Sequence, residues 1–259
     1  MDDGLHHVEH VMGTVFSFDL RCPATTATRT ALDKAITWLH RMDALFSTYQ
    51  PDSEISRLAR GELMLPACAP EVRHVLALGR RLETETGGWF SLTAAGLLDP
   101  NALVKGWAIE QVSTQLHRAG VQDHCVNGGG DIQTRGERSP GEPWRIGVAH
   151  PLDRGRLLTV VEGTDLAVAT SGITERGAHI TDPHTGLPVT DLLSLTLVGH
   201  QLTRLDALST ALFAMGETAL AKLDFDPRFH AHAVTRDGRH LTTNRNSLGE
   251  GQALSRIQW

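Results

Sequence analysis

The chain has 259 residues and a formal net charge of −6, which is long enough for one large domain with a substantial core. The acidic balance argues against a nucleic-acid groove, which needs clustered lysine and arginine. The acidic, polar start lacks a signal-peptide pattern, and no stretch approaches the ~20 apolar residues of a membrane helix. We therefore expect a cytoplasmic protein with no nucleic-acid partner and no membrane anchor. The three widely spaced cysteines indicate neither a disulfide framework nor a zinc knuckle.

The first half of the chain is expected to hold one strand and several helices. Residues 8–20 alternate as a strand that is interrupted at Met12, because a glycine inside a strand is typical of a bulge or a close backbone approach. Tyr49, the only tyrosine, falls on a loop. Apolar spacing and end signals predict these helices: 25–46, a short helix opened by 51–53, 70–86, and a helix that opens at Asp99 and closes at Gly120.

The second half of the chain is mostly sheet. The run from His124 to Gly136 is predicted to be two strands joined by a glycine-rich turn, and the last helix is expected from about Arg204 to Gly216. Further strands are predicted over 144–148, 157–162, 165–170, 193–198, and the two segments joined by residues 237–238. The pattern predicts a single α+β domain over residues 1–259, with helices layered on a mixed or antiparallel sheet.

The stretch from Leu166 to Val189 concentrates Ser, Thr, His and Asp beside Gly and Pro. It begins with the alternation of a strand and is expected to turn at Ser171 and Gly172. Small residues at such a turn leave amide N–H groups and hydroxyls to hold phosphate oxygens. The alternative is a hairpin with Asx and Ser/Thr turns, which needs no ligand. From this stretch alone, the two interpretations carry equal weight.

Asp206 and Thr210 lie four residues apart on the last predicted helix and therefore share one face. A carboxylate and a hydroxyl one turn apart offer hard oxygens to Mg²⁺, which keeps its other positions for water or phosphate. The alternative is a solvated Asp206 with the Thr210 hydroxyl hydrogen-bonded to the carbonyl four residues earlier. On these two residues alone, this alternative is favoured over a metal site. Lys105, near the start of its helix, suits either a solvated lysine or one that reaches a phosphate.

A series of short motifs runs along the chain: MGTVFSF, STYQPDSEISRL, TGGWFSLT, LVKGWA, VNGGGDI, PWRIGVAHP, ATSG, HITDPHTGLPV and DALSTALFAMG. In this order the motifs resemble those of the FAD:protein FMN transferase family, also called the ApbE family, over nearly the whole chain. No single motif is decisive, but so many in family order are hard to obtain by chance.

The resemblance implies an enzyme that binds FAD and Mg²⁺. It would transfer FMN through a phosphoester to a Ser or Thr of an acceptor protein and release AMP. His179 would be the candidate acid/base, and the metal would be held by the Ala102 carbonyl, Asp206 and Thr210. Residues implied to contact the flavin or the nucleotide are Met12, Tyr49, Trp89, Phe90, Ser91, Asp99, Lys105 and Ile180; Ser171 and Gly172 complete the expected binding set.

The chain departs from the family pattern at two places in this set. Ser91 stands where the family usually has Asp, and the segment that usually reads Asp-Leu-Gly-Gly-Ile-Ala-Lys-Gly is DPNALVKG in this chain. Two other functions use the same site: Mg²⁺-dependent hydrolysis of FAD to FMN and AMP, with water as the acceptor, and non-catalytic binding or trafficking of FAD. The sequence does not separate transfer from hydrolysis, because the acceptor lies on another chain.

Overall fold

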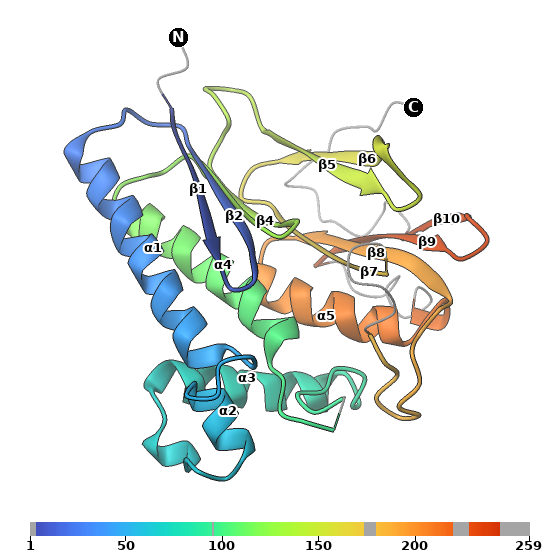
Figure 1. The fold of residues 1–259 in the computed structure, drawn as a ribbon. Helices are drawn as coiled ribbons and strands as arrows, with labels where there is room; N and C mark the ends of the chain where they lie inside the picture. Colours follow the sequence, from blue (N-terminus) through green and yellow to red (C-terminus); the bar gives the residue numbers. More distant parts are fainter. Residues whose placement is uncertain (1–3, 95, 174–179, 220–227, 244–259) are drawn as a thin grey trace.

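An antiparallel sheet carries the fold in this computed structural model, which describes residues 4–94, 96–173, 180–219 and 228–243 (Figure 1). Among these residues, eight strands pair in the order β1-β2-β3-β4-β7-β8-β9-β10, and β5 and β6 form a separate hairpin. The strands are β1 Leu5–Val11, β2 Thr14–Leu20, β3 His124–Gly128, β4 Asp131–Arg135, β5 Trp144–His150, β6 Asp153–Gly163, β7 Ala167–Gly172, β8 Leu192–Gly199, β9 His230–Thr235 and β10 His240–Thr242.

The helices follow the predicted apolar spacing closely. They are α1 Thr26–Phe46, α2 Glu54–Ala59, the short 3₁₀ helix Leu65–Ala67, α3 Pro70–Glu85, α4 Asn101–Arg118 and α5 Leu202–Ala214. Thr25 and Ser53 cap α1 and α2, because each side chain accepts a hydrogen bond from the N–H three residues on. Helix α4 lies between α1 and α5 and packs on β3 and β4, while α5 packs on β7 and β8 (Figure 1).

The two faces of the central strands bury different side chains. On β7, Ala167 and Ala169 belong to the main core beneath the helices, whereas Val168 points to a second cluster with Ile146 and Val161 of the β5–β6 hairpin. Strand side chains alternate between faces, so the hairpin covers the face that the helices leave. This is why β8 is buried along its whole length instead of alternating with polar residues.

The prediction of one interrupted strand over residues 8–20 is wrong. Met12 and Gly13 form the two-residue turn of a hairpin between β1 and β2, and both have positive φ, 55° and 67°. Two positive φ values in a two-residue loop match the twist of antiparallel strands. The glycine therefore marked a reversal of the chain and not a bulge.

The fold class is confirmed as α+β, with helices on an antiparallel sheet. The predicted turn at Ser171 and Gly172 is also wrong: both residues pair with β8, opposite Leu195 and Ser194. Within the described part of the chain, no helix combines the length and the apolar character needed to cross a bilayer.

Candidate functional site

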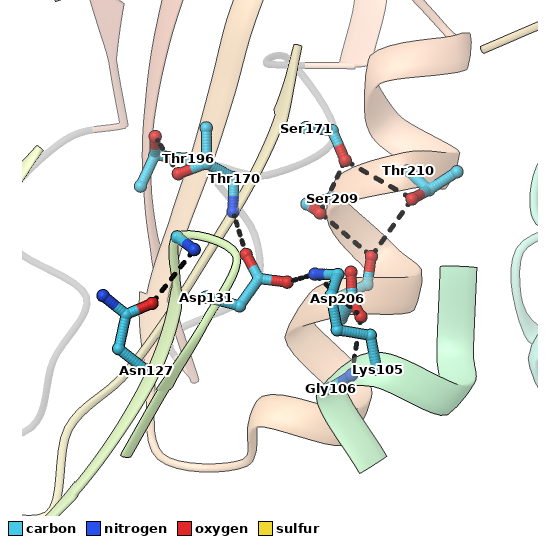
Figure 2. Close-up of polar contacts among 11 residues, drawn as sticks. Lys105, Gly106, Asn127, Asp131, Thr170, Ser171, Thr196, Asp206, Ser209 and Thr210 are labelled. Carbon is cyan, nitrogen blue, oxygen red and sulfur yellow. Dashed lines mark hydrogen bonds and ion pairs between the residues drawn. The ribbon is translucent and has the colours of Figure 1, made fainter. Parts of the chain in front are cut away.

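One end of the sheet brings together segments that are far apart in the sequence. Because β2, β3, β4 and β7 are antiparallel neighbours, the β1–β2 turn, the β3–β4 turn and the C-terminal end of β7 lie at the same end. The N–H of Gly129 in the β3–β4 turn donates to the carbonyl of Val15 at 3.1 Å, which ties the first two turns together. Helices α4 and α5 meet under this end (Figure 2).

Asp206 stands at the contact between α4 and α5. It is 5% exposed, and its Oδ2 accepts a hydrogen bond of 2.8 Å from the N–H of Gly106. In an α-helix that N–H is the partner of the carbonyl four residues earlier, which here belongs to Ala102. The Asp206 carboxylate therefore engages the N–H that would pair with the Ala102 carbonyl in a regular helix. The interpretation of Asp206 as a solvated residue is wrong, because the residue is buried.

Three hydroxyls gather one turn along α5 from Asp206: those of Ser209 and Thr210 on the helix and that of Ser171 on β7. The Oγ1 of Thr210 is 3.3 Å from the Asp206 carbonyl, to which it donates, and 3.3 Å from the Oγ of Ser171 on β7. Ser171 and Ser209 are 2.8 Å apart, and Ser209 also donates to the Asp206 carbonyl at 2.9 Å. The expected hydrogen bond from the Thr210 hydroxyl to the carbonyl four residues earlier is thus present. The same hydroxyl also contacts Ser171 of strand β7.

Lys105 adds a cation between two carboxylates. Its Nζ forms an ion pair with Oδ2 of Asp131, the first residue of β4, and lies 3.5 Å from Oδ2 of Asp206 (Figure 2). Asp131 is 1% exposed, and its other oxygen accepts a hydrogen bond of 3.0 Å from the N–H of Thr170. Lys105 is consequently not a solvated lysine, because its ammonium lies between two buried carboxylates.

The donor set at Asp206 suits a hard divalent cation. One carboxylate, one hydroxyl and one backbone carbonyl supply oxygens only, and such a partial set leaves coordination positions for water or phosphate, as Mg²⁺ requires. Among the described residues, including those around Asp206, no three His, Cys, Asp or Glu side chains gather as a metal site, so this set has one carboxylate beside a hydroxyl and a backbone carbonyl. Ala102, Asp206 and Thr210 would hold the cation, and the Lys105 ammonium lies 3.5 Å from Oδ2 of Asp206.

Two predicted binding segments meet at Trp89. The Trp89 ring packs edge-on against the ring of His184, with centroids 4.5 Å apart and an interplanar angle of 80°. His184 lies in a turn around Asp182, whose carboxylate accepts hydrogen bonds from the His184 N–H and the Thr185 hydroxyl. The hydrogen bond from the His184 N–H is the largest cause that lowers the pKa of Asp182. This is the Asx turn that the hairpin interpretation of the stretch expected.

The remaining predicted residues are distributed around these segments. Ile180 packs partly buried against the main core, and its carbonyl accepts the N–H of Val189. Just before α4, the Asp99 carboxylate accepts a hydrogen bond of 2.9 Å from the N–H of Asn101, the first residue of the helix. Met12 packs on the core from the β1–β2 turn, and Gly172 ends β7. His179, the predicted acid/base, lies outside the described residues.

Three residues of the predicted flavin pocket differ in exposure. Phe90 is 1% exposed within the core, so its side chain supports the segment from beneath and does not line an open pocket. Tyr49 is 92% exposed on its loop. Ser91 lies between these extremes, half-buried, with its Oγ accepting the N–H of Thr93 at 3.1 Å.

The sequence analysis missed Asp131 and Gly106. The run GGGD was interpreted only as part of a glycine-rich turn between two strands, although a carboxylate that directly follows three glycines was a usable signal for a buried charge at the end of a strand. Gly106 gave no such signal, because its importance arises from contact with α5: a Cβ at this position would lie 2.6 Å from the Cβ of Asp206.

The family profile described as the ApbE family matches residues 12–99 and 94–231. The chain belongs to the ApbE family. Solved structures share its architecture. The flavin transferase ApbE from Vibrio cholerae superposes with a TM-score of 0.81 at 23% identity, covering 93% of this chain and 97% of that one. The ApbE protein from Thermotoga maritima gives a TM-score of 0.80 at 20% identity with the same coverage. At these identities the likeness shows the ApbE fold.

Curated relatives are named FAD:protein FMN transferase. The one from Vibrio cholerae serotype O1 is 33% identical over 130 residues, which are 46% of this chain and 39% of the relative. The one from Haemophilus influenzae is 29% identical over 161 residues, 58% of this chain and 46% of the relative. The aligned part of this ApbE-family chain thus spans less than half the length of these two relatives.

Proposed function

We propose that this chain is a Mg²⁺-dependent FAD:protein FMN transferase that attaches FMN through a phosphoester to a Ser or Thr of an acceptor protein and releases AMP. Family membership and the names of the curated relatives support the activity. The observation that carries the proposal is the buried Asp206 carboxylate beside the Ala102–Gly106 turn of α4, with the Thr210 hydroxyl one turn along α5.

The reaction exchanges one phosphorus–oxygen bond for another. The acceptor hydroxyl oxygen bonds to the FMN phosphorus, the bond from that phosphorus to the oxygen of the AMP phosphate breaks, and AMP leaves with the bridging oxygen. Mg²⁺ bound at this site would neutralise the charge that develops on the phosphates. The hydroxyl proton needs a base, and we assign this role to His179.

The chain's own residues would bind and orient FAD around this centre. Asp206, Thr210 and the Ala102 carbonyl supply oxygens to the cation, and Ser171 fixes the direction of the Thr210 hydroxyl. Backbone groups at the end of β7, Ser171 and Gly172, are proposed to lie along the pyrophosphate. The remaining predicted contacts with flavin and nucleotide are Met12, Tyr49, Trp89, Ser91, Asp99, Lys105 and Ile180, and the buried Phe90 side chain supports its segment from the core.

The test follows both products. A Ser/Thr-bearing candidate acceptor is incubated with the chain, FAD and MgCl₂, and intact mass and AMP are measured. The proposal expects a gain of one FMN per modified acceptor, one AMP per FMN transferred, and neither product with EDTA. The His179→Ala variant should slow transfer far more than it weakens FAD binding.

Two outcomes would replace this function. AMP and free FMN without a modified acceptor would favour the hydrolase, because water would then be the acceptor. FAD binding with neither product would favour a flavin carrier built on the same fold.

A further inference from the structure

Asp131 is a buried charge for which the proposed reaction assigns no role. Its carboxylate is held from two sides: the Thr170 N–H of β7 donates to Oδ1 at 3.0 Å, and Lys105 of α4 forms an ion pair with Oδ2. Thr170 is itself held through its hydroxyl, 2.9 Å from that of Thr196 on β8. A carboxylate fixed by a backbone N–H of the sheet has little freedom to follow the lysine, so the sheet sets where the ammonium lies.

Lys105 has a second carboxylate within reach. Its Nζ is 3.5 Å from Oδ2 of Asp206, the same oxygen that accepts the Gly106 N–H (Figure 2). An ammonium that paired fully with Asp206 would neutralise the one carboxylate in the predicted metal set. Two cations would then compete for Asp206, and the lysine, which is covalently attached, would always be present.

We propose that Asp131 is a positioning residue for the metal site: it draws the Lys105 ammonium toward itself and thereby weakens the pairing of that ammonium with Asp206, the carboxylate proposed to bind a divalent cation. The inference rests on the proposed function, because it concerns the metal that this function uses. The charges support it: Lys105, Asp131 and Asp206 sum to −1, which attracts a cation, whereas without Asp131 the pair sums to zero.

The test measures Mn²⁺ binding to the FAD-free protein by electron paramagnetic resonance of the free ion, so it does not depend on turnover. Asp131→Asn should raise the Kd for Mn²⁺ roughly tenfold, because the local charge rises by one unit and Lys105 turns to Asp206. Lys105→Met should lower the Kd, because it removes the competing cation. The double variant should return to within about threefold of the wild type, since the local charge is again −1.

Asp123→Asn is the matched control. Asp123 also holds backbone, accepting the Glu137 N–H at 2.9 Å, but it precedes β3 at the opposite end of the β3–β4 hairpin. The Asp123→Asn variant loses the same charge as Asp131→Asn, and its Kd for Mn²⁺ should equal that of the wild type. A structural role for Asp131 would not produce recovery on deleting Lys105, because the double variant lacks still more contacts.

The outcomes separate the positioning role of Asp131 from the proposed function. If the wild type binds Mn²⁺ and Asp131→Asn binds it equally well, or if the double variant stays weak, the positioning role is refuted while the proposed function stands. If the folded wild type neither binds Mn²⁺ nor releases AMP from FAD, the proposed function fails and the inference falls with it. Should Asp131→Asn not fold, the Lys105→Met arm still decides, since an unchanged or raised Kd contradicts competition.

Discussion

Replacing Gly106 with alanine tests whether the contact between α4 and α5 shapes the metal site. A Cβ at Gly106 would lie 2.6 Å from the Cβ of Asp206, 2.9 Å from its Oδ2 and 3.0 Å from the carbonyl oxygen of Leu202. Two of these atoms belong to the carboxylate residue itself and the third to the backbone of α5. None of them is the flexible end of a long side chain, so the helices must separate or Asp206 must turn away.

The size of the effect combines two opposing terms. Overpacking of this kind costs about 1–3 kcal/mol, while alanine is about 1 kcal/mol better than glycine inside a helix. The net loss of stability should be about 0–2 kcal/mol, and at about 2–4 °C per kcal/mol the Tm should fall by no more than ~8 °C. Metal binding should suffer more than stability, because displacement of a ligand by a few tenths of an ångström degrades octahedral Mg²⁺ geometry. We expect Mn²⁺ affinity to fall roughly tenfold.

Gly79→Ala is the matched control for this variant. Gly79 is also a buried helical glycine, and its Cβ would lie 2.6 Å from a methyl carbon of Leu92, so the nearest atoms belong to a side chain and not to backbone. It lies on α3, outside the site. Calorimetry should show a comparable or smaller fall in Tm for Gly79→Ala, with unchanged Mn²⁺ affinity. If Gly106→Ala folds and binds Mn²⁺ as tightly as the wild type, the assignment of Asp206 and Ala102 as neighbouring ligands is refuted.

Three further predictions follow from individual residues. Asp206→Asn keeps an acceptor for the Gly106 N–H but should reduce Mn²⁺ affinity roughly 100-fold or more; an unchanged affinity would place the metal elsewhere. Tyr49→Ala should weaken FAD binding in a flavin-fluorescence titration if this exposed ring closes over the flavin, whereas equal affinity would place the flavin elsewhere. Burial lowers the pKa of His124 and of His232 to about 4, so the unfolded chain binds more protons below pH ~6.5. Unfolding free energy should therefore drop as pH falls from ~6.5 toward 4, each histidine contributing up to about 1.4 kcal/mol per pH unit; urea melts that show no loss between pH 6.5 and 5 would contradict this.

Local signals were sufficient for most of the secondary structure. The caps Thr25 and Ser53 and the glycines that follow the helices are short-range features, and each acts on its own few residues. The error at Met12 shows the limit of such signals. A glycine within an alternating apolar pattern fits both a bulge and a two-residue turn, and the choice depends on whether β1 and β2 can pair along their full length.

The site was harder to predict because it is formed by contacts between residues that lie far apart in the sequence. The helical spacing of Asp206 and Thr210 gave their shared face, but burial of the carboxylate depends on Gly106, about one hundred positions earlier. The ion pair of Lys105 with Asp131 likewise joins α4 to the sheet. Neither contact leaves a period or a spacing in the sequence, and the family resemblance pointed to Lys105 and Asp206 but to neither Gly106 nor Asp131.

The charge arrangement also explains why a divalent cation would be needed for an anionic substrate. Lys105 is the cation between Asp131 and Asp206, and the three side chains together carry −1. A pyrophosphate that approached this cluster alone would meet net repulsion in a poorly solvated place, where Coulomb energies are larger than in water. With one divalent cation bound at Asp206, the cluster would carry +1 and attract the same group. FAD affinity should therefore rise with Mg²⁺ in the wild type, and the rise should be smaller in Asp206→Asn.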